Sequence, residues 1–239
     1  MKYIFAFLLL VGLYFVGVVF VFLYKKSHLP ELPTLVHTES VVGQGQPLRY
    51  IAAGDSTAVG VGASELAATY PMQVAAMLAR TTEVSYKNVA VSGAKTEDFI
   101  ATQLPQILEY KPDVVTISIG ANDATHLRSN ERVLQNFKTI LNTLVEKTDA
   151  VVYVANIPNF SEGTLLPWFY QKLLESRSVW LNRQIAELAT ERVRVVNVHD
   201  TLLVQHNDRS KTFAADGFHP NDAGYANWTA AFQAEIETK

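Results

Sequence analysis

A serine, a histidine and an aspartate stand in sequence contexts that suit nucleophilic catalysis. Ser56 lies in the motif GDST at positions 54–57, directly after the apolar run 50–53, so we expect it at the tip of a strand. Asp216 and His219 share a much later motif, DGFHP at 216–220. A serine hydroxyl is a poor nucleophile until a base accepts its proton, and that base needs a group that fixes its tautomer. The two motifs supply a candidate for each task.

Two further motifs lie between these, and each follows an apolar run. They are VSGA at positions 91–94 and IGAND at 119–123. Each could place a hydrogen-bond donor near Ser56. If the apolar runs are strands of one parallel sheet, all of these motifs meet at the carboxyl edge of that sheet, where ligands bind in such folds.

The four motifs, in this order, resemble the SGNH hydrolases, also called GDSL-type esterases and lipases. The resemblance covers roughly residues 48–231. Each motif alone occurs often by chance, and the ordered set carries the resemblance. One residue departs from the family pattern, because Thr57 stands where the family often has leucine. That position is not catalytic, so the departure concerns the subfamily more than the activity.

The resemblance gives each candidate residue a role, and each has a plainer alternative. Ser56 is the expected nucleophile, His219 the general base and Asp216 its orienting partner; the alternatives are a turn serine, a surface histidine and a turn aspartate. Gly93 (backbone N–H), Asn122 (side-chain amide) and the backbone N–H of Ser56 are the expected oxyanion donors. Preorganised donors of this kind are worth about 3–4 kcal/mol each. The alternatives are a turn glycine and a helix-capping asparagine.

The N-terminal run from Tyr3 to Tyr24 carries no charge and is long enough to span a bilayer as a helix. A cleavable signal peptide is the rival interpretation. The run is long for one, and no small-residue cleavage site follows it. We expect residues 1–26 to be an uncleaved membrane anchor and residues 27–47 a linker, which could reach roughly 70 Å if fully extended.

The orientation of this anchor is open between two readings. Lys25 and Lys26 follow the run, and the positive-inside rule taken literally favours a cytoplasmic domain. An N-terminal anchor ahead of a hydrolase is also a common way to hold a domain outside the cell. We favour the extracytoplasmic placement.

Strand-like and helical patterns alternate through residues 48–239. The expected strands are 48–53, 84–91, 114–119, 151–155 and 193–198, and the expected helices are 70–78, 96–109, 131–147, 173–191 and 222–236. Alternation of this kind predicts a parallel sheet covered on both faces. We therefore expect one α/β domain, a flavodoxin-like three-layer sandwich with a parallel five-stranded sheet, preceded by one transmembrane helix.

Composition narrows the functional classes. The formal charge of −3 indicates no nucleic-acid surface, and the absence of cysteine excludes disulfides and thiolate chemistry. No metal-ligand spacing is apparent, the 54–62 segment lacks the end of a Walker motif, and the proposed chemistry needs no cofactor.

These observations predict a serine-dependent carboxylic ester hydrolase that is lysophospholipase- or esterase-like. The alternatives are an O-acetyl esterase acting on cell-envelope polysaccharide and a non-catalytic binding module on the same fold. The family acts on lysophospholipids, simple esters, thioesters and O-acetylated sugars, and the sequence does not choose among them. The apolar segment 157–170 suits an acyl chain, or else caps its own domain.

Overall fold

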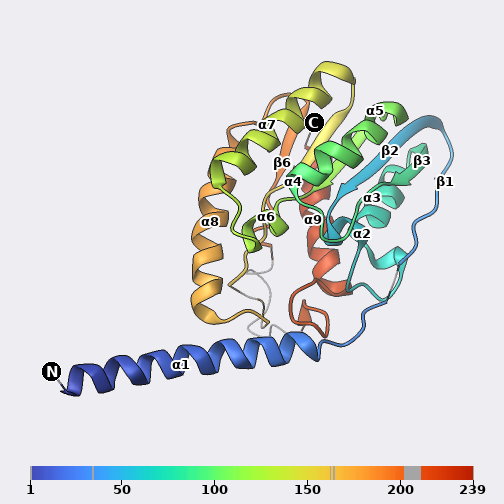
Figure 1. The fold of residues 1–239 in the computed structure, drawn as a ribbon. Helices are drawn as coiled ribbons and strands as arrows, with labels where there is room; N and C mark the ends of the chain where they lie inside the picture. Colours follow the sequence, from blue (N-terminus) through green and yellow to red (C-terminus); the bar gives the residue numbers. More distant parts are fainter. Residues whose placement is uncertain (1, 34, 162, 164, 202–210, 239) are drawn as a thin grey trace.

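A six-stranded sheet forms the middle layer of the molecule, with helices on both faces (Figure 1). The computed structural model describes residues 2–33, 35–161, 163, 165–201 and 211–238. The strands are β1 (Ser40–Val42), β2 (Gln46–Gly54), β3 (Thr82–Asn88), β4 (Val114–Ser118), β5 (Val151–Ala155) and β6 (Val193–Val196). Their order across the sheet is β1-β3-β2-β4-β5-β6.

Five of these strands run parallel, as the sequence predicts. If these five strands are numbered 1 to 5 along the chain from β2, their order across the sheet is 2-1-3-4-5, which is the flavodoxin-like order. The direction of the strand order reverses beside β2. The sixth strand, β1, was not expected. It pairs antiparallel with β3 at the edge of the sheet, and it lies inside the stretch 27–47 that the sequence suggests is a linker. Three residues are too few to show a strand period, so the pattern could not reveal it.

Two helical layers cover the sheet (Figure 1). One contains α3 (Tyr70–Leu78) and α9 (Asp222–Glu237); the other contains α5 (Leu104–Tyr110), α7 (Asn130–Lys147) and α8 (Trp168–Ala186). The expected helix 70–78 is present with the same bounds, and the expected helices 131–147 and 222–236 are each one residue longer at one end. The expected helix 96–109 is instead three joined pieces: α4 (Thr96–Asp98), one π-helical segment (Phe99–Gln103) and α5. The expected helix 173–191 begins and ends five residues earlier.

Strand β2 is buried on both faces over its last five residues, and its side chains alternate between the two halves of the core. Tyr50 and Ala52 face the layer of α3 and α9, whereas Ile51 and Ala53 face the other layer. This alternation follows from the two-residue period of a strand. The chain therefore reaches Gly54 in a rigid, central position.

Helix α1 (Lys2–Ser27) extends along the edge of the domain at which the parallel strands end (Figure 1). Among the described residues it is the one helix that is long and apolar enough to cross a membrane, and a signal sequence would meet the same criterion. It touches the start of α8: the rings of Phe15 and Phe169 are 5.3 Å apart, and the Trp168 indole donates a hydrogen bond to the Tyr14 hydroxyl.

The segment after α1 is fixed to the domain over much of its length. His37 Nε2 lies 2.7 Å from the carbonyl oxygen of Val59, and its Nδ1 lies 3.1 Å from the Tyr86 hydroxyl. Leu35 packs against the core half of α3 and α9, and β1 follows. The freely extensible linker predicted from the sequence is therefore limited to the few residues before Leu35.

Candidate active site

The turn after β2 holds Ser56 at the first position of the short helix α2 (Ser56–Val59). Gly54 has φ 141°, and a Cβ there would lie 1.9 Å from the carbonyl oxygen of Ser118, so only glycine fits. Asp55 then caps α2, because its Oδ1 accepts from the backbone N–H and the hydroxyl of Thr57 at 3.0 and 2.8 Å. Asp55 therefore organises the loop, and Ser56 is only 8 % exposed.

Thr57 is the residue that departs from the family pattern. Its hydroxyl joins the Asp55 carboxylate to the Ser118 hydroxyl, 2.6 Å away. The side chain is buried between the ends of the neighbouring strands β2 and β4. A polar link therefore occupies a place that an aliphatic side chain would fill by packing.

Ser56, His219 and Asp216 form a continuous chain of hydrogen bonds. The Ser56 Oγ lies 3.0 Å from His219 Nε2, and His219 Nδ1 lies 2.6 Å from Asp216 Oδ2. The second carboxylate oxygen of Asp216 accepts from the backbone N–H groups of Phe218 and His219. This is the geometry of a nucleophile, a base and an orienting carboxylate.

The environment of Asp216 favours its ionised form. Burial alone would raise the pKa of this carboxyl, but the hydrogen bond and charge of His219, with two backbone N–H donors, lower the pKa below its ordinary value. The loop that carries the pair is closed by backbone bonds from Ala214 N–H to the His219 oxygen and from Gly217 N–H to the Ala214 oxygen. An ionised Asp216 can hold the imidazole and stabilise its protonated form.

Gly93 and Asn122, the expected oxyanion donors, are tied to the nucleophile turn from two sides. Asn122 lies on α6 (Ala121–Thr125), which follows β4, and its amide donates to the carbonyl oxygen of Ala94 at 3.0 Å. The N–H of Val91 donates to the oxygen of Gly54 at 3.0 Å. Gly93 therefore lies on a turn between Val91, which is bonded to Gly54, and Ala94, which is bonded to Asn122.

Space at these donors is open. Gly93 has φ 81°, and a Cβ there would meet nothing within 4 Å. The Asn122 amide has a second hydrogen that its bond to Ala94 leaves available. Asn122 lines a cavity together with Ser56 and His219, whereas Gly93 does not line it.

Asp123 fixes this donor region rather than facing the cavity. Its carboxylate accepts from the backbone N–H and the hydroxyl of Thr96 at 2.9 and 2.8 Å, and burial raises its pKa. The Thr96 hydroxyl in turn accepts from the Asn136 amide at 2.9 Å. The network joins α4, α6 and α7, and the sequence analysis missed Thr96 and Asn136. The only trace of Thr96 and Asn136 in the sequence is that each is a polar residue on an otherwise apolar helix face.

Gln103 is a further residue that the sequence analysis missed. Its side-chain oxygen accepts from the Gly54 N–H at 2.7 Å, and its amide donates to the Gly54 oxygen at 2.8 Å. The side chain is fully buried and lies at the end of the π-helical segment, an irregularity that often marks functional sites. A glutamine on a helix gives no sequence signal of this role.

The cavity beside Ser56 is mainly apolar. The side chains that line it besides the polar residues include Phe160, Leu166, Phe213, Phe218 and Trp228. Phe160 and Phe218 stack with ring centroids 6.3 Å apart. Such a lining suits the acyl part of an ester better than a hydrated sugar.

The other described histidines lie outside this arrangement. His199 is buried, its Nδ1 lies 3.0 Å from the Ile157 oxygen, and it faces Glu175. His37 holds the segment after α1, and His126 Nδ1 lies 2.8 Å from the Asn122 oxygen. Across the residues that the structure describes, no group of three or more His, Asp or Glu side chains could hold a metal ion.

Comparison with known proteins agrees with the fold and with the four motifs. Solved structures with similar folds include the lipase Lip_vut3 from a goat rumen metagenome (24 % identity, 79 % of this chain and 97 % of that one, TM-score 0.64). A second is the acetylxylan esterase Axe2 from Geobacillus stearothermophilus (19 % identity, 83 % of this chain and 97 % of that one, TM-score 0.62). A third is a member of the lipolytic G-D-S-L family from Veillonella parvula (16 % identity, 80 % of this chain and 99 % of that one, TM-score 0.64). At these identities the likeness concerns the fold.

No curated protein sequence matches the chain. The model of the GDSL-like lipase/acylhydrolase family, however, matches residues 52–226, a range that is well over half of the chain and includes the positions of all five candidate site residues. The resemblance of the sequence motifs is thereby confirmed, and the chain belongs to the GDSL-like lipase/acylhydrolase family of serine ester hydrolases.

Proposed function

We propose that this chain hydrolyses carboxylic esters through an acyl-enzyme formed on Ser56. The observation that carries the proposal is the hydrogen-bond chain Ser56–His219–Asp216, with separations of 3.0 and 2.6 Å. His219 Nε2 accepts the hydroxyl proton as Ser56 Oγ attacks the ester carbonyl carbon. The charge on the former carbonyl oxygen is met by the Gly93 and Ser56 N–H groups and the Asn122 amide.

The tetrahedral intermediate collapses when the bond to the leaving alcohol breaks, and His219 returns its proton to that alcohol. Water then enters, loses a proton to His219 and attacks the acyl carbon. The bond between that carbon and Ser56 Oγ breaks, His219 returns its proton to Oγ, and the carboxylic acid leaves. Asp216 stays ionised throughout and orients the imidazole. No cofactor enters either step.

The substrate that the cavity favours is a lipid-like ester, in agreement with the lysophospholipase- or esterase-like prediction. Phe160, Leu166 and Phe218 give the acyl side an apolar wall. An O-acetyl esterase for cell-envelope polysaccharide is the alternative, and a binding module without catalysis is a more remote one. A panel of short acyl, long acyl and acetyl-sugar esters separates the three.

We assign residues 1–26 to a membrane anchor, residues 27–47 to a linker whose later part packs on the domain, and residues 48–239 to the hydrolase domain, which lies outside the cytoplasm. The apolar length of α1 supports the anchor. Alkaline carbonate should leave the protein in the membrane, and detergent should release it. Protease added to intact spheroplasts should cut the domain away; a protected domain would favour the cytoplasmic orientation.

A fluorophosphonate probe tests the central step. It should label the wild type and fail to label Ser56→Ala. Ser176→Ala, which removes an exposed hydroxyl from α8, is the matched control and should label normally. Labelling of Ser56→Ala at the wild-type level would exclude Ser56 as the nucleophile.

A further inference from the structure

The active-site edge of the domain is held close to the end of α1. The segment after α1 is fixed from Leu35 onward, by its packing, by His37 and by β1. The eight Cα–Cα steps from Ser27 to Leu35 can span about 26–29 Å at most. The domain therefore cannot move far from the anchor.

A groove leads from the active site to α1. Asn122, Leu166 and Phe218 line both the cavity at Ser56 and this neighbouring groove. The far wall of the groove is α1 itself, through Val19 and Phe22. Figure 1 shows α1 passing the edge of the sheet that carries α2 and α6, which agrees with this connection.

The part of α1 that forms this wall lies near one end of the apolar run. Lys25 and Lys26 end that run, so the boundary between hydrocarbon and polar headgroups is expected beside them. At 1.5 Å per residue, Val19 lies about 9 Å from Lys25 along the helix axis. The groove thus runs from the polar boundary at Lys26 to about 9 Å inside it at Val19, so it takes in the ester groups of membrane lipids and the first part of their acyl chains.

Lipid is also the occupant that the exposed side chains fit. The domain presents Trp168 beside α1 and Leu173 farther along α8, with exposed fractions of 57 % and 44 %. The apolar surface of α1 itself is almost entirely uncovered by protein.

We propose that α1 is one wall of an acyl-chain groove and that the substrate is a long-chain ester lipid of the membrane in which α1 is anchored. The inference rests on the proposed ester hydrolysis at Ser56. The acyl chain lies between α1 and the 165–170 segment, with its ester carbonyl at Ser56. Hydrolysis adds water across the ester bond and gives the remaining alcohol and a fatty acid, which enters the same membrane. The anchor therefore takes part in substrate binding.

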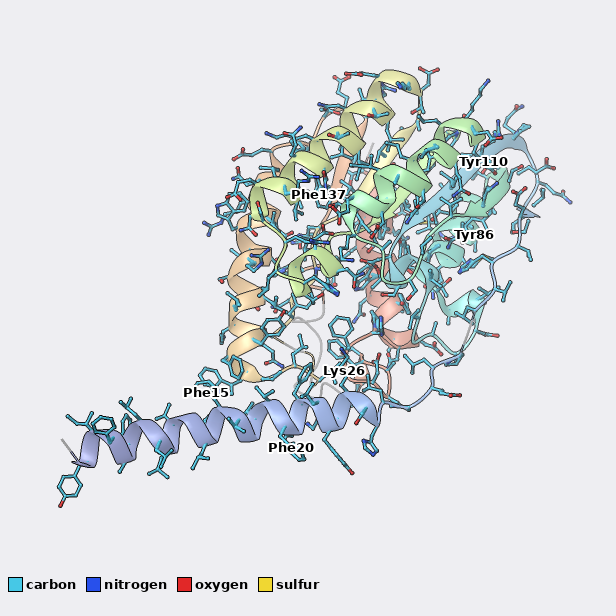
Figure 2. All side chains as sticks on the ribbon, viewed as in Figure 1. Phe15, Phe20, Lys26, Tyr86, Tyr110 and Phe137 are labelled. Carbon is cyan, nitrogen blue, oxygen red and sulfur yellow. The ribbon has the colours of Figure 1, made fainter. Side chains whose placement is uncertain are left out.

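Two phenylalanines of α1 provide a matched test. Phe22 lines the groove, whereas Figure 2 shows Phe20 on the side of α1 that faces away from the domain. The full chain is placed in vesicles of ether lipids, which it cannot hydrolyse. Fatty-acid release from a lysophosphatidylcholine held in those vesicles is compared with hydrolysis of water-soluble p-nitrophenyl acetate.

The measured quantity is the ratio of kcat/KM for the long and the short ester. Phe22→Ala should lower this ratio about 5- to 10-fold, because an acyl chain loses an aromatic contact, and Phe20→Ala should leave the ratio within twofold. Equal ratios for the two variants would overturn the inference. So would a wild type that cleaves the short ester but not the lysolipid. Hydrolysis of neither ester by the wild type would instead refute the proposed function.

Discussion

Gln103→Met tests whether a buried side chain far from the substrate holds the nucleophile turn in place. Methionine has nearly the same length and shape as glutamine but makes no strong hydrogen bond. The substitution removes the two bonds, of 2.7 and 2.8 Å, between Gln103 and the main chain of Gly54. Ser56 is two residues farther along the chain, so the change acts on the turn without touching the reacting atoms.

The two lost bonds have different costs. The oxygen of Gly54 keeps a second donor, the N–H of Val91 at 3.0 Å. Losing the bond from the Gln103 amide to this oxygen therefore lowers the free energy of unfolding by only about 1 kcal/mol. The N–H of Gly54 finds no second acceptor in the described part of the chain and is left buried and unsatisfied, which costs about 1–3 kcal/mol. We therefore expect Gln103→Met to lower the free energy of unfolding by about 2–4 kcal/mol.

Gln106→Met is the matched control, because it makes the same substitution one turn away on α5. Gln106 is exposed and donates only to the Thr102 oxygen, so its loss should cost less than about 0.5 kcal/mol. Urea denaturation measures both values. Gln103→Met should also lower kcat on a short ester at least about tenfold with little change in KM, because the nucleophile moves relative to its base. A stability within 0.5 kcal/mol of Gln106→Met, with normal kcat, would refute the reasoning.

Five other substitutions test the site. His219→Ala should lower kcat by several powers of ten and Asp216→Asn by somewhat less, in steady-state assays with a soluble ester. Asn122→Ala should lower kcat about 100- to 1,000-fold at nearly constant KM; a pure KM effect would make it a substrate-binding residue. Burial raises the pKa of Asp55 to about 6, from 3.8 ordinarily, so the folded state holds this proton more tightly than the unfolded state. The protonated carboxyl therefore stabilises the wild type below pH 4, and this contribution is lost as the pH rises to 6. Measured by urea denaturation relative to the wild type, the free energy of unfolding of Asp55→Asn should rise by up to about 3 kcal/mol between pH 4 and pH 7. A difference that stays constant over this range would contradict the raised pKa. Thr96→Val should lower the free energy of unfolding by about 2–3 kcal/mol, because it strands the buried partners of that hydroxyl; a cost below 0.5 kcal/mol in the same assay would contradict the network.

The sequence predicted the features that depend on local pattern. Apolar runs gave the five parallel strands, and β5 was predicted with its bounds exact. The motif residues Ser56, Asp216 and His219 come together because each follows a strand or a turn at one sheet edge. Whether those residues act as proposed is a matter for the assays above.

The features that the sequence missed depend on contacts between distant segments. Strand β1 exists because β3 offers it an open edge, and three residues of a linker show nothing of that partner. Gln103 reaches Gly54 only because a π-helical turn redirects its side chain. The reach of the linker was overestimated for the same reason, since the docking of His37 on Val59 and Tyr86 has no counterpart in the local sequence.

The bond between Ser56 and His219 joins positions 163 residues apart, and this separation governs when the site can first exist. A ribosome adds about 5–20 residues per second, so the nucleophile turn waits roughly 8–30 seconds for its base to be synthesised. The segment that carries His219 is then held against the sheet by α9, whose Trp228 and Phe232 pack on Tyr70 of α3. Under the proposed anchoring and the proposed ester hydrolysis, a nascent chain inserted in a membrane is consequently inert toward the lipids around it until its last helix has docked.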